Sequence, residues 1–265
     1  MMRRLVAGGL VALLLTGCAT GSPNGSPQAS SSDSAAVGYA PPILDASELE
    51  SIRDARVFFA HRSVGAEIVE QGVPAVYEEF DLPPLAANED EGVAFFDDWL
   101  EQTEDPMDKL ESFPAILAGD FPDGSVDVAF MKLGYVDIVE ETDVEALFEA
   151  YTAMMDDLSA SYPTVTFLHV TVTPTRWQPE NNAKIEEFNE LVRQEYADRG
   201  RLIDLAGALS QCPDGTVDRH ETEEGDSYSQ ICEAFTRDGG HLSPEGAATA
   251  AAELLSVVAA NLVDR

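Results

Sequence analysis

Short apolar runs alternate along this chain with longer stretches in which apolar residues recur at helical spacing. The runs that predict strands are residues 57–60, 93–96, 126–131, 164–170 and 201–205. The stretches that predict helices are residues 64–72, 144–158, 185–196 and 244–262, and residues 100–117 have scattered helical spacing that is interrupted at Pro106 and Pro114. Strands separated in this way by helices favour an α/β domain with a mostly parallel sheet covered on both faces. Ligands of such sheets bind beyond the carboxyl ends of the strands.

The first predicted strand gives way to a helix at Ser63. The apolar run 57–60 is followed by His61, Arg62 and Ser63, and helical spacing begins at once at Val64. A serine at such a turn is lifted clear of the sheet and lies close to the first amides of the helix. This position suits a nucleophile whose substrate develops negative charge. The alternative is that Ser63 only caps the helix.

Two further polar clusters fall near predicted strand ends. Lys132 and the sequence Gly-Tyr-Val-Asp at 134–137 follow the strand that ends at residue 131, and Asp-Gly-Gly-His at 238–241 precedes the last helix. Serine becomes a good nucleophile only when a neighbouring base takes its proton, and an imidazole base needs a carboxylate to fix its tautomer. Asp238 and His241, three residues apart on a glycine-containing loop, can supply this pair.

In order and spacing these clusters resemble the SGNH (GDSL-type) hydrolase superfamily. The resemblance rests on a serine between an early strand and a helix, Gly-x-x-Asp after a middle strand, and Asp-x-x-His before the C-terminal helix. It implies a flavodoxin-like three-layer α/β/α sandwich and ester hydrolysis through an acyl-enzyme, with no cofactor and no metal. It also implies that Ser63 is the nucleophile, His241 the general base and Asp238 its orienting partner.

The chain departs from the family pattern at two clusters. His-Arg-Ser at 61–63 stands where the family has Gly-Asp-Ser, and Val136 replaces the asparagine that supplies an oxyanion-hole donor. Loss of one such donor costs about 10²–10³ in turnover. Beside the Ser63 amide, the candidate oxyanion or substrate-binding residues are therefore His61, Arg62, Gly92, Lys132, Gly134 and Asp137. Alternatively, His61 and Arg62 pair with nearby carboxylates, and Lys132 forms a structural ion pair with Asp137.

The N-terminus has the layout of a signal peptide. Two arginines precede an apolar stretch, residues 5–15, that is too short for a stable membrane span. The sequence Leu-Thr-Gly-Cys then resembles a bacterial lipobox, which implies cleavage before Cys18 and acylation of that cysteine. An ordinary signal peptide with an incidental cysteine is the alternative. We expect a signal peptide at 1–17, a flexible Ser/Gly/Pro tether at 18–40 and a domain at 41–265, anchored outside the cytoplasm on the cell membrane.

The composition is strongly acidic, with Asp+Glu 49 against Lys+Arg 15 and a formal charge of -34. Such a field repels nucleic acid and anionic lipid, so we expect no nucleic-acid partner and membrane contact only through the lipid on Cys18. The acidic residues are spread along the whole domain. This distribution fits a protein from a high-salt habitat or simply an acidic secreted protein.

Two cysteines remain once Cys18 is assigned to lipid. Cys212 and Cys232 flank a polar stretch, 213–231, without an evident helix or strand. In an oxidising compartment the pair predicts a disulfide that closes this loop. A metal site is the weaker interpretation, because the pair lacks the companion ligands of a CxxC or HExxH motif.

Three hypotheses for function follow. The first is an exported, lipid-anchored serine esterase that acts on acyl or acetyl esters of small molecules or glycans. The second is a non-catalytic surface lipoprotein that binds carbohydrate or peptide on a degenerate hydrolase fold. The third, phosphate-ester or metal-assisted chemistry, lacks a ligand cluster in the sequence. Trp99 and Trp177 can line a groove for sugar rings, although buried or half-buried packing is the commoner fate of tryptophan.

Overall fold

The parallel strands of the central sheet run in the order β2-β1-β3-β4, and β5 continues β4 to pair with β6. This is a computed structural model, and it describes residues 39–85 and 95–262. The predicted signal peptide, Cys18, most of the tether and Gly92 lie outside these residues. The strands are β1 (Val57–His61), β2 (Phe95–Trp99), β3 (Val128–Met131), β4 (Thr166–Phe167), β5 (His169–Val170) and β6 (Leu202–Ile203).

Strand β1 lies inside the sheet and is buried along its whole length. It pairs in parallel with β2 on one side and with β3 on the other, so that His61 lies opposite Trp99 and Ala60 opposite Met131. The carboxyl ends of the three strands therefore meet at one edge. The predicted strands at 57–60, 126–131, 164–170 and 201–205 are confirmed in position, and β2 covers the described part of the one predicted at 93–96.

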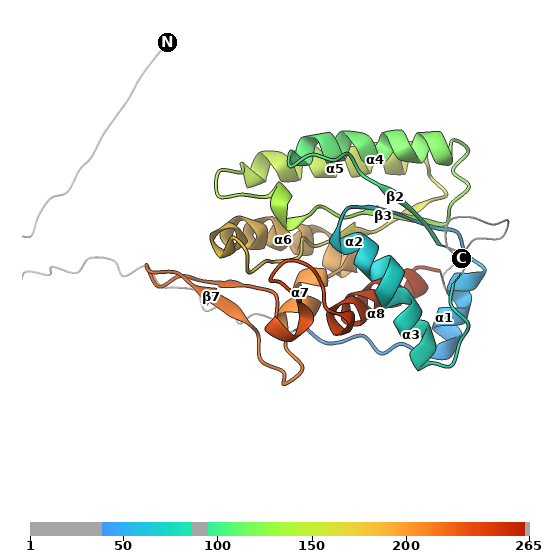
Figure 1. Cartoon of the computed structure of the whole chain (residues 1–265). Helices are drawn as coiled ribbons and strands as arrows, with labels where there is room; N and C mark the ends of the chain where they lie inside the picture. Colours follow the sequence, from blue (N-terminus) through green and yellow to red (C-terminus); the bar gives the residue numbers. More distant parts are fainter. Residues whose placement is uncertain (1–38, 86–94, 263–265) are drawn as a thin grey trace, which may run out of the picture. The chain divides into compact units, whose positions relative to one another are not determined.

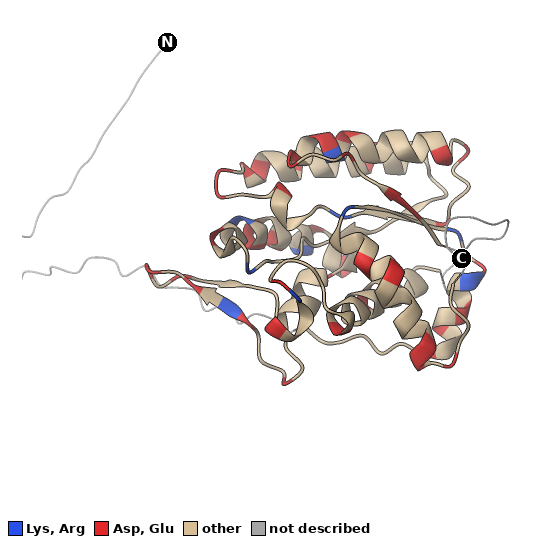
Figure 2. Ribbon diagram, in the orientation of Figure 1, with Lys and Arg blue, Asp and Glu red and all other residues tan. Residues whose placement is uncertain are grey.

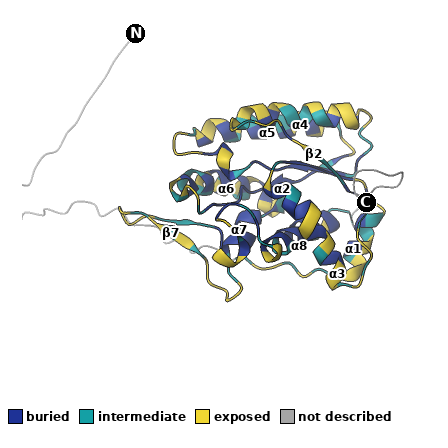
Figure 3. Cartoon of the chain, viewed as in Figure 1, coloured by how far each residue is buried: buried dark blue, intermediate teal, exposed yellow. Residues whose placement is uncertain are grey.

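Helices cover both faces of the sheet, as the predicted three-layer sandwich requires (Figure 1). One layer contains α4 (Pro106–Asp120), α5 (Val144–Ser161) and α6 (Asn182–Tyr196), in which α5 contacts both of the others. In the other layer, α8 (Pro244–Ala260) contacts α1 (Ala46–Arg53), α3 (Val73–Glu79) and α7 (Leu205–Ser210). Buried residues fill the strands and the inner sides of these helices (Figure 3).

The helix after Ser63 is longer than the sequence predicts. Instead of ending at Gly72, it runs through α2 (Val64–Glu67), a π-helical turn (Ile68–Gly72) and α3 without a break. Gly72 serves helix packing here, because a Cβ on it would lie 2.1 Å from the carbonyl oxygen of Ala247 in α8. The prediction of a stop was therefore wrong because the glycine permits a close approach between two helices.

The segment between the two cysteines has more structure than predicted. A disulfide bond joins Cys212 to Cys232, which confirms the predicted pairing. The stretch between them contains an antiparallel hairpin of β7 (Arg219–Glu221) and β8 (Ser227–Ser229). The sequence prediction missed this hairpin because its strands are three residues long and lack an apolar face.

Acidic residues occur on the helices of both layers and on the hairpin, whereas basic residues are few (Figure 2). The acidic charge is thus spread over the described surface rather than gathered at one place. Within the described ranges, no helix combines the length and the apolar character needed to cross a bilayer.

Candidate active site

Ser63 lies at the turn between β1 and α2, at the carboxyl edge of the sheet, and is exposed. Its backbone has φ +45°, a region that non-glycine residues rarely adopt. Its side chain makes no capping hydrogen bond to the helix that follows. The serine is therefore held in a strained conformation without serving as a helix cap, and strain of this kind is concentrated at functional sites.

Asp238 and His241 form a hydrogen-bonded pair on the loop before α8. Nδ1 of His241 lies 2.9 Å from Asp238 Oδ2. The other carboxylate oxygen accepts the backbone N–H groups of Gly240 and His241. These two backbone donors, with that of His241 the stronger, lower the pKa of Asp238 to about 2. Asp238 is thus an anion that can hold the imidazole with Nε2 free to accept a proton.

Packing fixes the loop that carries this pair. Gly239 has φ +99°, which favours glycine, and its carbonyl oxygen accepts the backbone N–H of Arg176. The indole N–H of Trp177 donates to the carbonyl oxygen of Asp238 at 2.5 Å, and its ring meets His241 edge-on. Trp177 is 48% exposed, so it covers the loop from the solvent side. It therefore supports the site instead of belonging to the core.

Glu67 connects the helix after Ser63 to the same loop. Its carboxylate is buried and accepts the backbone N–H of Leu242 at 2.7 Å and a hydrogen bond from the Arg237 guanidinium. Since Glu67 lies one helical turn after Ser63, the loop with Asp238 and His241 is attached directly to the helix that begins at the serine. The sequence analysis did not identify Glu67, because its partners are distant in the sequence.

A buried ionic cluster lies beneath the 134–137 segment. Asp137 bonds Lys109 of α4 at 2.5 Å and accepts the backbone N–H of Gly134 through its other oxygen, whereas Lys132 donates to the carbonyl oxygen of Leu133. Burial raises the pKa of Asp137 and lowers that of Lys132 to about 8. The predicted partner of Asp137 was Lys132; the bonded lysine is Lys109, which the sequence analysis did not single out.

The two residues before Ser63 differ in their exposure, since His61 is buried and Arg62 is partly exposed. His61 is fully buried, with Nε2 3.1 Å from Asp97 on β2, as the alternative of a carboxylate partner predicts. Arg62 is partly exposed and lies over the ring of Trp99, with the guanidinium carbon 4.7 Å from the ring centroid. Substrate binding by His61, Lys132 and Asp137 stays a prediction, and their burial limits it to effects through neighbouring groups.

The clusters of Ser63, Gly134 and His241 lie at one edge of the sheet, but Ser63 is not hydrogen-bonded to the proposed base. No hydrogen bond connects Ser63 Oγ with His241, although both residues lie in the described part of the chain. The backbone N–H of Ser63 also has no acceptor among the described residues. Catalytic hydrogen bonds are often long in unliganded enzymes and tighten when substrate binds.

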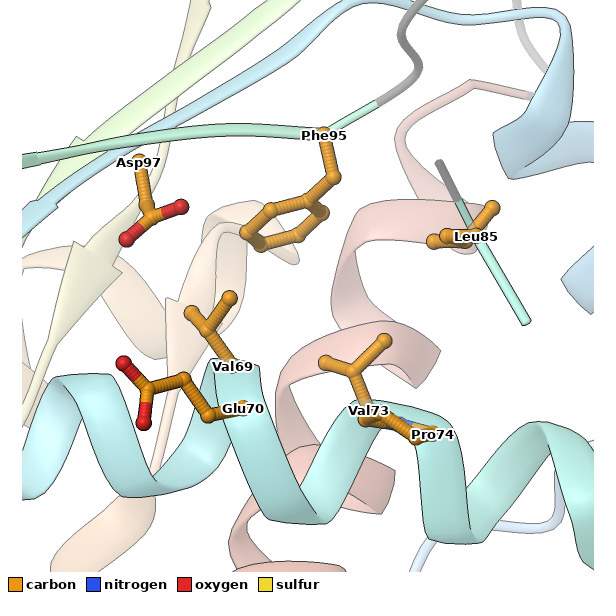
Figure 4. A pocket seen from close by; sticks show the side chains of 7 residues that line it. All are labelled: Val69, Glu70, Val73, Pro74, Leu85, Phe95 and Asp97. Carbon is orange, nitrogen blue, oxygen red and sulfur yellow. The ribbon is translucent and has the colours of Figure 1, made fainter. Parts of the chain in front are cut away.

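A pocket lies between β2 and the helix that follows Ser63, and none of Ser63, Asp238 and His241 lines it (Figure 4). Val69, Glu70, Val73 and Pro74 line it from the helix, and Phe95 and Asp97 line it from the strand, with Leu85 at one end. The carboxylates of Asp97 and Glu70 point toward the same space. Its acidic lining is unsuited to an anionic group.

A metal-binding arrangement is not supported by the described residues. The one group with suitable spacing combines Cys212, Cys232 and Asp218. Its two sulfur atoms already form the disulfide bond, so they are not available as thiolate ligands.

Comparison with known proteins gives similarity in structure and none in sequence. Neither a protein-family model nor a curated protein matches the chain. A carbohydrate esterase of family 3 from Talaromyces cellulolyticus is 15% identical, with 79% of this chain and 98% of that chain covered and a TM-score of 0.50.

Two further solved structures have slightly lower scores. A proposed lipolytic protein of the G-D-S-L family from Desulfitobacterium hafniense DCB-2 is 13% identical over 77% of this chain and 99% of that one, with a TM-score of 0.48. A psychrotrophic esterase from Pseudoalteromonas sp. is 11% identical over 77% and 97%, also with a TM-score of 0.48. This chain shares the fold of the carbohydrate esterase, and its mostly parallel sheet between helical layers is the α/β fold class that the sequence predicts.

Proposed function

We propose that this protein is a serine esterase that hydrolyses acyl or acetyl esters. The observation that carries the proposal is the Asp238–His241 pair, attached through Glu67 to the helix that begins at a strained and exposed Ser63. A carboxylate that orients an imidazole next to an exposed serine is the arrangement that activates a hydroxyl nucleophile. The fold and the order of the site residues along the chain support the same assignment.

The mechanism follows from the roles of these groups. Ser63 Oγ attacks the ester carbonyl carbon while His241 Nε2 accepts the hydroxyl proton, and Asp238 stabilises the imidazolium through Nδ1–H. The imidazolium then gives its proton to the departing alcohol, which leaves an acyl group on Ser63. Water attacks this acyl-enzyme with His241 again as base, releasing the acid and restoring the serine. The free N–H of Ser63 is the described donor best placed for the oxyanion.

Export and lipid anchoring are part of the proposal. The signal-peptide layout and the cysteine at position 18 support an esterase tethered outside the cytoplasm. The disulfide bond between Cys212 and Cys232 fits the same oxidising surroundings.

A non-catalytic binding protein is the second candidate, and one observation favours it. The oxyanion-hole asparagine of the family is replaced by Val136, and the nearby N–H of Gly134 is engaged by Asp137. A site with these two changes has fewer donors for a developing negative charge.

Labelling with a fluorophosphonate probe separates the two candidates. For an esterase, the parent protein becomes labelled and both Ser63→Ala and His241→Ala remain unlabelled, because the probe reacts only with an activated serine. Ser256→Ala, at a partly buried position in the last turns of α8, is a matched control and should label like the parent. Failure of the folded parent to label, or labelling that persists in Ser63→Ala, contradicts the proposed chemistry.

A further inference from the structure

Arg62 differs from most of the arginines in its surroundings. Arg176, Arg193, Arg199, Arg219 and Arg237 each bond a carboxylate, as expected in a chain of formal charge -34. The side chain of Arg62 makes neither an ion pair nor a hydrogen bond with any described residue, and its guanidinium lies over the ring of Trp99. Arg53, Arg56 and Arg201 likewise form no ion pair with a described residue, and what distinguishes Arg62 from them is its place directly before Ser63.

The position of Arg62 places this charge beside the reacting serine. Arg62 directly precedes Ser63 at the carboxyl end of β1, and Trp99 ends the neighbouring strand opposite His61. Trp99 is 50% exposed. The guanidinium and the indole thus form one surface at the sheet edge, and this surface is continuous with the turn that holds the serine.

Two acidic groups of the site, Asp97 and Asp238, have partners other than Arg62. Asp97 bonds His61 Nε2 on the buried side, and Asp238 is held by His241 and by two backbone N–H groups. The guanidinium carbon lies 4.7 Å from the centroid of the indole ring, and the side-chain N–H donors form no hydrogen bond with a described residue. The planar guanidinium of an arginine can donate two parallel hydrogen bonds to the two oxygens of a carboxylate.

We propose that Arg62 and Trp99 form a subsite that selects esters carrying a carboxylate close to the scissile bond. This inference rests on the proposed esterase function and names its substrate class. The carboxylate can belong to the acyl part, as in a hemiester of a dicarboxylic acid, or to the alcohol part, as in an acylated uronic acid. Arg62 binds this charge, and Trp99 supports the guanidinium and the adjoining apolar or sugar surface.

A binding experiment on the full chain with Ser63→Ala tests the subsite without any turnover. Calorimetry compares two matched pairs of ligands. The first pair is monomethyl and dimethyl succinate, and the second is methyl 3-O-acetyl-galacturonoside and methyl 3-O-acetyl-galactoside. The affinity of each ligand is measured for the Ser63→Ala protein and for three double variants that add Arg62→Gln, Arg62→Lys or Arg219→Gln to it. Arg219, on the hairpin, is the charge-matched control.

We expect the carboxylate-bearing member of one pair to bind at least about tenfold more tightly than its neutral partner. Arg62→Gln should abolish this preference, Arg62→Lys should keep part of it, and Arg219→Gln should keep all of it. The pair that shows the preference identifies which part of the ester carries the charge. Equal binding of charged and neutral ligands in both pairs, or a preference that survives Arg62→Gln, overturns the subsite. If the fluorophosphonate probe does not label the parent protein, that result counts against the esterase function. The binding comparison in Ser63→Ala is independent of it and still tests the subsite.

Discussion

Glu67 Oε2 accepts the backbone N–H of Leu242 at 2.7 Å, across 175 residues of sequence. The bond joins the helix that begins after Ser63 to the residue that follows His241. A second bond, from Arg237 to the other oxygen of Glu67, holds the opposite end of the same loop. Because both carboxylate oxygens are used and the residue is buried, Glu67 positions His241 relative to Ser63 without belonging to the reacting groups.

We expect Glu67→Ala to lower the rate of fluorophosphonate labelling by about ten- to a hundredfold, since a shift of the base by about 1 Å can cost this much. Glu67→Gln should fall between Ala and the parent, because an amide oxygen can still accept the Leu242 N–H. Glu70→Ala, which removes an exposed carboxylate from the same helix, is the control. Parent-like labelling of folded Glu67→Ala would show that the residue serves stability alone.

Asp238→Asn should reduce ester hydrolysis by about 10³–10⁴-fold while leaving the fold intact. The amide oxygen can still accept the N–H groups of Gly240 and His241, but the neutral side chain no longer stabilises the imidazolium. Since the pKa of Asp238 is about 2, the carboxylate stays ionised above about pH 3, and acid inactivation above that pH arises from other groups. A pH profile of kcat/KM for parent and variant checks both statements.

Ser63→Gly should be more stable than Ser63→Ala by about 1 kcal/mol, because glycine adopts φ +45° without the strain that any Cβ introduces. Both variants lose the hydroxyl, so the difference isolates the backbone. Denaturant titration measures it. Equal stability of the two variants would mean that the turn carries no appreciable strain.

Lys132 should make stability increase with pH between about 8 and 10.5. Burial lowers its pKa in the folded protein to about 8, so in this range the unfolded chain binds the proton and the folded protein does not. The free energy of unfolding therefore rises with pH, by on the order of 1–3 kcal/mol. Lys132→Met should remove this rise, whereas Lys184→Met, at a partly exposed position of α6, should keep it. Denaturant titrations at a series of pH values test the difference.

Gly72→Ala should destabilise the protein by about 1–3 kcal/mol, because the added methyl group meets the Ala247 carbonyl oxygen of α8. Gly119→Ala is the matched control: a Cβ at this position in α4 meets nothing within 4 Å. It should be neutral or stabilising by up to about 1 kcal/mol. Thermal unfolding of the two variants gives the comparison, and similar losses in both would exclude the packing explanation.

The strands and the position of Ser63 were predictable because both depend on local pattern. The run of apolar residues from Val57 marks a buried strand, and polar residues directly after it mark the sheet edge. The cap of α8 was equally local, since Ser243 accepts the N–H of Gly246 within one turn. Asp238 and His241 were recognisable for the same reason, because three residues separate them.

The remaining features depend on contacts between distant segments. A glycine such as Gly72 has the same local signal whether it ends a helix or allows another helix to approach, and only the position of Ala247 decides. Lys109 and Glu67 look like ordinary helical residues until the fold brings Asp137 and Leu242 to them. The exposure of Trp99 and Trp177 was also not predictable, because tryptophan is usually buried or half-buried. These two are exposed because of where the fold places them, which the local sequence does not indicate.

The attachment of Glu67 to Leu242 also has a consequence for the order in which the protein becomes active. A ribosome produces Ser63 before His241, so a growing chain holds the nucleophile without its base until the loop before α8 has been made. The early helix also lacks its packing partner until α8 is made, since α8 contacts the π-helical turn and α3. A chain truncated before residue 238 can therefore contain the serine and every described strand, yet it lacks the proposed base that activates the hydroxyl.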